Sequence, residues 1–362
     1  MALDARRNDA YAEALRQFVG PESVVLDLGA GTGIHGLIAA RLGAKRVYLV
    51  EPEDILSVAE EIVRANGLGD RVRCFHGRIE DVRLPEQVDV IVSVLTGNFL
   101  LTEDLLPALF HARDTALKPG GRLIPQAATM EAVPVSAPQV HAKDIASWSV
   151  PQQGVDMSVA RTYAANTIFY GAEHFKDASY LADPMTLHRL DLLHDVYEGV
   201  HTEATFEIAR SGICHGVAGW FSLQLGDRWL STSPQAESLH WSAAFLPLDP
   251  PMPLELGEQV SFSLDRQPYG DWTWRLQSAT ASRRHSTLLS APMKASTLRK
   301  ASLEYTPVST ADGHAAAYVL SRCDGKHTLH AIASDVQARY PERYPTSHDA
   351  LSFVQGVVRR YA

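Results

Sequence analysis

The sequence predicts three domains of different fold class: an α/β domain over residues 1–126, an antiparallel β-barrel domain over 127–300 and a small helical domain over 301–362. Strand and helix patterns alternate in the first, which is typical of a parallel, doubly wound sheet. Short strands between proline and glycine turns fill the second, and helical spacing of apolar residues returns in the third. The length of 362 residues suits two or three domains.

The composition is that of an ordinary globular protein. Hydrophobic residues make up 46% of the chain and charged residues 21%. No window of about 18 apolar residues occurs, so a membrane span is not expected, and the polar N-terminal segment is unlike a signal peptide. The net charge of −9 disfavours nucleic-acid binding, which requires a positive surface field, and is compatible with a cationic substrate.

The three cysteines, Cys74, Cys214 and Cys323, lie far apart in the sequence. Their odd number and their spacing predict neither a disulfide framework nor a metal site. The histidines form no H-E-x-x-H or similar ligand pattern either. We therefore expect a protein of a reducing cytoplasm that holds no metal.

The first strand, residues 23–28, is followed at once by a glycine-rich loop. The loop reads Gly29-Ala30-Gly31-Thr32-Gly33, and a helix with apolar residues on one face follows it. Glycines let the backbone adopt φ > 0 and approach a ligand closely, and the helix N-terminus behind them favours a negatively charged group. A dinucleotide fingerprint would need a glycine where Ile34 stands, so a nicotinamide cofactor is disfavoured.

An acid ends the second strand, residues 47–50. Glu51 stands there, where a carboxylate can accept both hydroxyls of a ribose. Further strands at 72–76 and 89–93 continue the alternation. Because ligands of a doubly wound sheet bind at the carboxyl ends of its strands, these residues predict a nucleoside pocket at that edge.

The spelling LDLGAGTG at residues 26–33 resembles motif I of class I S-adenosylmethionine-dependent methyltransferases. Over residues 1–300 the chain resembles the protein arginine methyltransferase family, because several further motifs stand in that family's order. They are Asp4-x-x-Arg7-x-x-x-Tyr11, GAKRVYLVE, GRIEDVRLPE, VDVIVS, GNFLLTEDLL, ARDTALKPGGRLIP, LSTSP and LHW. The resemblance implies a Rossmann-like methyltransferase domain, a β-barrel with a helical arm, and S-adenosyl-L-methionine as cofactor.

The resemblance also implies how single residues bind the cofactor. Arg7 would pair with its carboxylate, Glu51 would accept the ribose hydroxyls, and Ile79 and Glu80 would face the adenine. The other residues implied at the cofactor are Asp27, Gly29, Gly31, Gly33 and Ser93. The family's Tyr-Phe-x-x-Tyr helix, which covers the cofactor, is not in this sequence, so we expect a different cover or none.

The catalytic segment departs from the family pattern S-E-x-x-G-x-x-L-x-x-E-S. Glu103 stands at the second glutamate, but Val94 replaces the first. A guanidinium is planar, always charged, and best held by carboxylates on more than one edge; burying it half-paired is costly. Four explanations stay open: arginine binds differently, Asp104 or another acid substitutes, the nucleophile is an imidazole or amine, or the loop is inactive.

His240 and Trp241 match the family's Thr-His-Trp loop, with Leu239 in place of the threonine. We expect His240 to form an acid–imidazole pair with Glu103 or Asp104 in the folded protein. Glu103 and His240 are therefore the predicted catalytic residues.

A mixed helical pattern interrupts the barrel strands near residues 158–198. In the family an insertion at this position dimerises two subunits. The segment is rich in large apolar residues, and an exposed apolar patch marks an interface, so we predict a homodimer. The residues concerned are Ile168, Phe169, Tyr170, Phe175 and Tyr180.

The last domain lies beyond the family match. Its stretch AAAYVLSRCDGKHTLHAIASDVQARY resembles the helical part of small winged-helix domains that bind leader peptides. A plain helical hairpin explains the same apolar spacing at Leu329, Ile332, Ala333 and Val336. We therefore expect either a helical or a winged-helix-like domain, and possible binding of a leader peptide.

These observations predict an S-adenosylmethionine-dependent N-methyltransferase that acts on a basic side chain, arginine or histidine, of a peptide or protein. The alternatives are a free basic metabolite such as arginine as substrate, or an inactive subunit that keeps the cofactor pocket. Intact glycines, Glu51 and Glu80 favour an enzyme. The single carboxylate Glu103 predicts transfer that stops at one methyl group.

Overall fold

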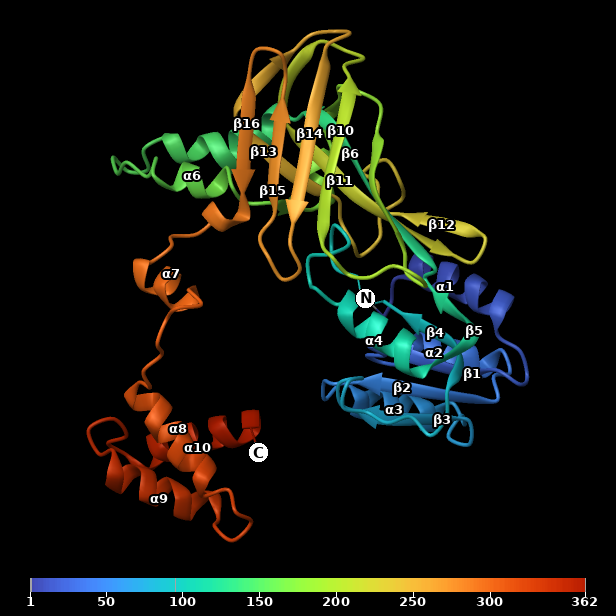
Figure 1. The fold of residues 1–362 in the computed structure, drawn as a ribbon, viewed down its shortest axis with the longest axis vertical. Coiled ribbons are helices and arrows are strands. Elements are labelled where there is room, and N and C mark those ends of the chain that lie inside the picture. Colours follow the sequence, from blue (N-terminus) through green and yellow to red (C-terminus); the bar gives the residue numbers. More distant parts are fainter. Residues whose placement is uncertain (1, 95, 362) are drawn as a thin grey trace. The chain divides into compact units, whose positions relative to one another are not determined.

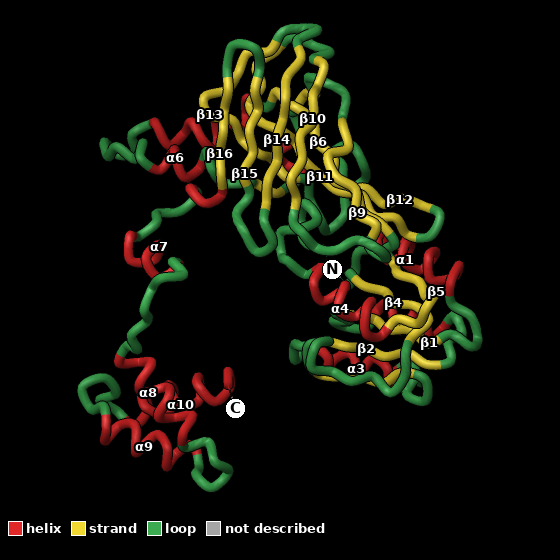
Figure 2. Tube along the Cα trace, viewed as in Figure 1, coloured by secondary structure: helices red, strands yellow, loops and turns green. Residues whose placement is uncertain are grey.

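A computed structural model describes residues 2–94 and 96–361. The chain divides into two compact units, Met1–Pro292 and Met293–Ala362. Figure 1 shows the first unit as an α/β part joined to a β part, and Figure 2 shows the second unit as helices, in red, joined by loops. None of the helices in the described residues is long and apolar enough to cross a membrane.

The α/β part of the first unit is a five-stranded parallel sheet in the order β3-β2-β1-β4-β5. Its strands are β1 Val24–Leu28, β2 Arg46–Glu51, β3 Val72–His76, β4 Val88–Ser93 and β5 Leu117–Ile124; its helices are α1 Ala5–Phe18, α2 Ile34–Arg41, α3 Leu56–Ala65 and α4 Leu106–Ala116. Every residue of β1 is buried, because its apolar side chains pack on both faces of the sheet. The strand order reverses between β1 and β4, which is where such sheets bind ligands.

The β part of the first unit consists of two antiparallel sheets. The larger has the order β7-β13-β11-β6-β8, with β12 beside β11 and β9 beside β6, and the smaller has the order β10-β14-β15-β16. The bounds are β6 Ala127–Ser136, β7 Phe169–Tyr170, β8 Ser179–Tyr180, β9 Met185–Asp191, β10 Val200–Glu207, β11 Gly212–Leu225, β12 Arg228–Ser231, β13 Ala244–Leu254, β14 Gln259–Arg266, β15 Thr273–Gln277 and β16 Ser282–Ser286. The named strands thus form an open barrel, and alternate residues of β14 are buried in its core.

The arm lies between β6 and β9, and its helix α6 projects from the barrel in Figure 1. It contains α5 Pro138–Val140, η1 His141–Ile145, η2 Ala146–Ser149, α6 Ala160–Ala164 and η3 Ala172–Phe175; a further short helix, η4 Thr287–Leu289, follows β16.

The large apolar residues near 168–180 do not form an exposed patch, so the prediction of an interface made by exposed side chains of these residues is wrong. Ile168 and Phe175 are each 8% exposed, and Phe169 and Tyr170 pair with β13. These side chains instead hold the arm on the barrel. The exposed apolar side chains of the arm lie earlier in the chain: Trp148, Val150, Val155, Met157 and Val159.

The second unit consists of α7 Ala295–Ala301, α8 Ala311–Ser321, α9 Leu329–Arg339 and α10 Ser347–Tyr361. Threonine side chains cap α8 and α9: Thr310 accepts from the Gly313 amide and Thr328 from the Ala331 amide. The unit has its own small apolar core, built from residues such as Val319, Val336 and Val354. No strand occurs among its described residues, so it has the predicted helices without a wing.

Candidate active site

The glycine loop joins β1 to α2 in a left-handed backbone conformation. Gly29, Gly31 and Gly33 have φ of 67°, 54° and 78°. A Cβ on Gly33 would lie 2.8 Å from Leu49 Cδ1, whereas nothing lies within 4 Å of the corresponding position on Gly31. The loop therefore packs against the sheet at Gly33 and presents bare backbone to open space at Gly31.

Glu51 is the last residue of β2 and lies against this loop. Its side chain is mostly buried, and Oε2 accepts from the Gly31 amide at 2.8 Å while Oε1 accepts from the Glu53 amide at 3.0 Å. A carboxylate has about four acceptor positions, so two remain for the hydroxyls of a ribose. The loop and the acid are held as one preorganised unit that fits a nucleoside.

Asp27 is the fourth of the five residues of β1 and is buried. It accepts a hydrogen bond of 2.7 Å from the Gly36 amide, which attaches the first turn of α2 to the strand. Burial raises the pKa of Asp27 to about 7; the Glu51 charge adds to this, and the Gly36 bond and the Arg7 charge oppose it.

Helix α1 carries Arg7 across the carboxyl ends of the strands. Its guanidinium is buried, 2% exposed, and lies 6.0 Å from the centre of the Trp241 ring. The Tyr11 hydroxyl donates to the carbonyl of Ser93, the last residue of β4, at 3.0 Å. A buried cation at this edge fits the carboxylate of an amino acid moiety. Burial lowers the pKa of Arg7, and the neighbouring Tyr11, Asp4 and Asp27 oppose that shift.

Ile79 and Glu80 follow β3. The Gly77 amide donates to the Glu51 carbonyl at 3.0 Å, which places this segment beside the end of β2. Ile79 is 5% exposed and Glu80 is exposed. The structure thus brings the segment predicted to face the adenine next to the acid predicted to bind the ribose.

Glu103 lies in a tight hairpin that follows β4. Gly97 and Leu100 form a bridge, and Phe99 and Leu100 are buried with φ of 50° and 63°. A Cβ on Gly97 would lie 2.9 Å from Glu103 Cγ, so glycine allows the glutamate to lie against the turn. The Glu103 side chain is exposed, and Val94 is half-buried against the core.

Asp104 is not free to replace the missing glutamate. Its carboxylate accepts from Arg266 Nη1 at 2.8 Å and Nη2 at 2.6 Å, from the Tyr197 hydroxyl at 2.6 Å and from the Tyr269 amide at 3.1 Å. The bond from Arg266 lowers the pKa of Asp104 to about 2. The Asp104 carboxylate is therefore engaged within the protein, so Asp104 does not substitute for the missing glutamate.

The sequence predicted that His240 pairs with Glu103 or Asp104. That prediction is wrong, because His240 pairs with Asp4. Asp4 Oδ2 accepts from the His240 amide at 2.9 Å and lies 3.0 Å from its Nδ1, while Oδ1 caps α1 through the Arg7 amide. Burial lowers the pKa of His240, against the opposing effect of Asp4. The sequence does mark Asp4 as a candidate N-cap residue, because an aspartate precedes the helix pattern three places before Arg7, but it does not indicate the contact with His240.

The loops that carry Glu103 and His240 are bonded to each other. Trp241 Nε1 donates to the Thr96 carbonyl, and the Ser242 amide donates to Asn98 Oδ1, both at 3.0 Å. The structure thus brings the two predicted catalytic loops together beside the start of α1, which carries Arg7, and after Ser93 at the end of β4.

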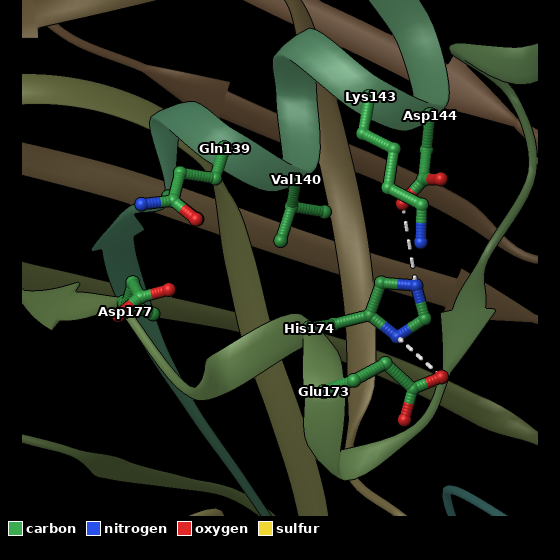
Figure 3. Close-up of a pocket in the computed structure, with 9 residues that line it drawn as sticks. Gln139, Val140, Lys143, Asp144, Glu173, His174 and Asp177 are labelled. Atoms are coloured by element: carbon green, nitrogen blue, oxygen red, sulfur yellow. Dashed lines mark ion pairs between the residues drawn. The ribbon is translucent and has the colours of Figure 1, made fainter.

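The cavity in Figure 3 is separate from these residues. It lies at the base of the arm, where His174 stands 3.4 Å from Asp144 and 3.9 Å from Glu173. None of the predicted site residues lines it.

The sheet order, the glycine loop after β1 and the acid at the end of β2 define a class I methyltransferase. Residues 25–121 match the family model described as a methyltransferase domain, and residues 126–279 match the arginine methyltransferase oligomerization subdomain. The chain belongs to the protein arginine methyltransferase family, and its cofactor is S-adenosylmethionine.

Individual relatives show how far the similarity extends. The chain is 32% identical to protein arginine N-methyltransferase 6 of Xenopus laevis over 281 residues, 74% of this chain and 82% of that protein. It is 36% identical over 231 residues to the probable protein arginine N-methyltransferase 6 of Arabidopsis thaliana, 62% of this chain and 53% of that protein. It thus spans about half the length of the Arabidopsis protein.

Solved structures share the fold. The Trypanosoma brucei PRMT1 enzyme–prozyme heterotetrameric complex with AdoHcy aligns with a TM-score of 0.71 and 25% identity, over 78% of this chain and 95% of that one. Arabidopsis thaliana protein arginine methyltransferase 10 aligns with a TM-score of 0.65 and 24% identity, over 78% and 95% of the two chains.

Proposed function

We propose that this enzyme transfers a methyl group to a guanidinium nitrogen of arginine in a peptide or protein. The observation that carries the proposal is Glu103, an exposed acidic residue on a tight hairpin that is hydrogen-bonded to the His240 loop. Curated relatives named protein arginine N-methyltransferases support the choice of acceptor.

When bound, the cofactor would supply an electrophilic methyl group from a sulfonium and would leave as a neutral thioether. A guanidinium nitrogen would accept the methyl carbon as the carbon–sulfur bond breaks, and the guanidinium would give up one proton. Arg7, Glu51 and the glycine loop would hold the cofactor. Glu103 would accept an N–H of the acceptor, which aligns the nucleophile and gives its proton a first acceptor.

Val94 limits how the acceptor is held. With an apolar side chain at the first position, a guanidinium meets one carboxylate rather than two. One carboxylate orients one nitrogen, so we propose that the reaction stops at one methyl group. A histidine imidazole, which also needs one acid, is the rival acceptor; a free basic metabolite and an inactive subunit are the other candidates.

Transfer of tritium-labelled methyl groups tests the proposal. The substrates are an arginine peptide, the same peptide with histidine or lysine at that position, and free arginine. We expect label in the arginine peptide alone, recovered as monomethylarginine after hydrolysis. Label in the histidine peptide or in free arginine would replace the proposed acceptor. Cofactor binding without any transfer would favour the inactive subunit.

Val94→Glu is the matched variant for the missing acid. If the second carboxylate edge is all that the pocket lacks, this variant raises turnover on the arginine peptide. Unchanged turnover would show that Val94 does not limit the reaction.

We further propose that the protein is a homodimer that uses the arm. The exposed apolar residues Trp148, Val155 and Val159 and the match to an oligomerization subdomain support this assembly. Sedimentation at micromolar concentration should show a dimer, and Trp148→Ser with Val159→Ser should shift it to monomer. A wild-type monomer would exclude the proposal.

A further inference from the structure

The hairpin that carries Glu103 is fastened immediately after that residue. Asp104 has φ of 51°, a left-handed conformation that is unfavourable for a residue with a side chain. Such a conformation persists when surrounding contacts determine it. Here the contacts are four hydrogen bonds that the Asp104 carboxylate accepts from the barrel domain.

Arg266 provides two of these bonds from the last position of β14. Its side chain is 5% exposed, and its two terminal nitrogens bind the two carboxylate oxygens separately. A bidentate pair of this kind fixes direction as well as distance, because both groups are planar. Lysine keeps the charge but has no such geometry. Tyr197 donates the third bond, and burial raises its pKa to about 12, so its hydroxyl stays protonated.

The same part of the barrel also holds the start of the hairpin. Arg266 lies 5.3 Å from the Trp272 ring, and that ring lies 5.1 Å from the ring of Phe99. The hairpin is thus anchored to the barrel at Phe99 and at Asp104, and between these residues the chain makes a turn in which the Asp104 amide donates to the Leu101 carbonyl at 3.3 Å. Glu103 is therefore, like Thr102, an exposed residue of a short turn that is held at both ends.

We propose that Asp104 and Arg266 form a latch that positions Glu103 for methyl transfer. The proposal rests on the role assigned to Glu103 under the proposed function. The latch residues do not touch the acceptor; they set the backbone direction from which the Glu103 side chain projects. Loosening the latch therefore lowers turnover while the cofactor, held by α1, the glycine loop and Glu51, binds as before.

The test compares Arg266→Lys, Glu103→Gln and the double variant in the full-length enzyme, with an arginine peptide as acceptor. We expect Arg266→Lys to lower kcat about 10- to 100-fold, the scale of a misplaced catalytic group, with the cofactor Kd within about twofold of wild type by calorimetry. In the Glu103→Gln background the same change should lower kcat less than about threefold, because the residue that the latch positions has already been disabled.

Arg343→Lys is the matched control, since Arg343 makes a bidentate pair with Asp312 in the second unit. It should leave kcat unchanged. Tyr197→Phe removes the hydroxyl that donates to Asp104 and leaves Arg266 in place, so it should lower kcat by a smaller factor. It provides a second test of the latch if the Arg266 variant fails to fold.

The outcomes separate the latch from the proposed function. If Glu103→Gln lowers kcat but Arg266→Lys and Tyr197→Phe do not, the latch is wrong and the role of Glu103 stands. If Arg266→Lys lowers kcat by the same factor with and without Glu103, its role is only structural. If Glu103→Gln leaves kcat unchanged, both the role of Glu103 and the latch are overturned.

Discussion

Replacing Glu51 by glutamine tests how the cofactor pocket is built. The carboxylate accepts the Gly31 amide at 2.8 Å and the Glu53 amide at 3.0 Å, and two acceptor positions remain for a ribose. Glutamine keeps one oxygen and presents an NH2 group at the other position. That NH2 group faces an amide donor within the loop and cannot accept from a ribose hydroxyl.

The expected loss is large for a one-atom change. Hydrogen bonds to a charged group contribute about 1.5–3 kcal/mol each. Loss of one bond within the loop and one to the ribose amounts to about 3–6 kcal/mol, which weakens binding by up to roughly 10²- to 10⁴-fold. Part of this loss falls on the loop itself, so the free protein should also melt at a slightly lower temperature.

Isothermal calorimetry with S-adenosylmethionine and its demethylated product measures the change, with circular dichroism to verify folding. Glu53→Gln is the control, because the Glu53 side chain is exposed and only its backbone amide bonds to Glu51. It should leave the Kd unchanged. A Glu51→Gln protein that binds within threefold of wild type would refute the argument for a preorganised ribose site.

The remaining predictions concern stability and the second unit. The folded-state pKa of Asp27, about 7, lies above its unfolded value of 3.8, so its contribution to stability is full below about pH 4 and is lost as the pH rises through 7. In urea titrations, the free energy of unfolding of wild type should therefore fall by roughly 3–4 kcal/mol more than that of Asp27→Asn between pH 4 and 8. Parallel pH dependences of the two proteins would contradict this. Gly33→Ala should lower the melting temperature more than Gly31→Ala, because its Cβ would meet Leu49, while Gly31→Ala should weaken cofactor binding; equal melting temperatures would count against the packing role. Asp249→Asn should lower the free energy of unfolding by about 1–3 kcal/mol, because Asp249 bonds to Arg161 and His141 of the arm. The figure is modest because Arg161 is 32% exposed and solvent screens its charge. An unchanged unfolding midpoint would show that Asp249 does not hold the arm. Deletion of residues 293–362 should leave the cofactor Kd within about twofold, because the predicted cofactor residues lie in the first unit; a weaker binding of peptide by the deleted form would support a role of the second unit in substrate capture.

The parts of the site that were predicted from the sequence are those made by neighbouring elements. A buried strand, three glycines at positive φ and a helix follow one another within a few residues, and Glu51 ends the next strand. Parallel strands bring their carboxyl ends to one edge of the sheet, so the register of Glu51 beside the loop follows from the order of elements alone. Local patterning was sufficient there because each contact joins segments close in the chain.

The tertiary structure decided the contacts between distant segments. Asp4 and His240 are 236 residues apart, and Asp104 and Arg266 are 162 apart. From the sequence we expected Glu103 or Asp104 as the partner of His240, and Asp4 was not considered, because the sequence of an acidic residue does not say which distant segment will lie against it. The docking of the barrel on the α/β sheet made the choice, placing the capping residue of α1 beside the histidine and Arg266 beside Asp104. Burial acted in the same way on the arm: apolar residues near 168–180 and 148–159 look alike in composition, and only packing on the barrel determines which of them remain exposed.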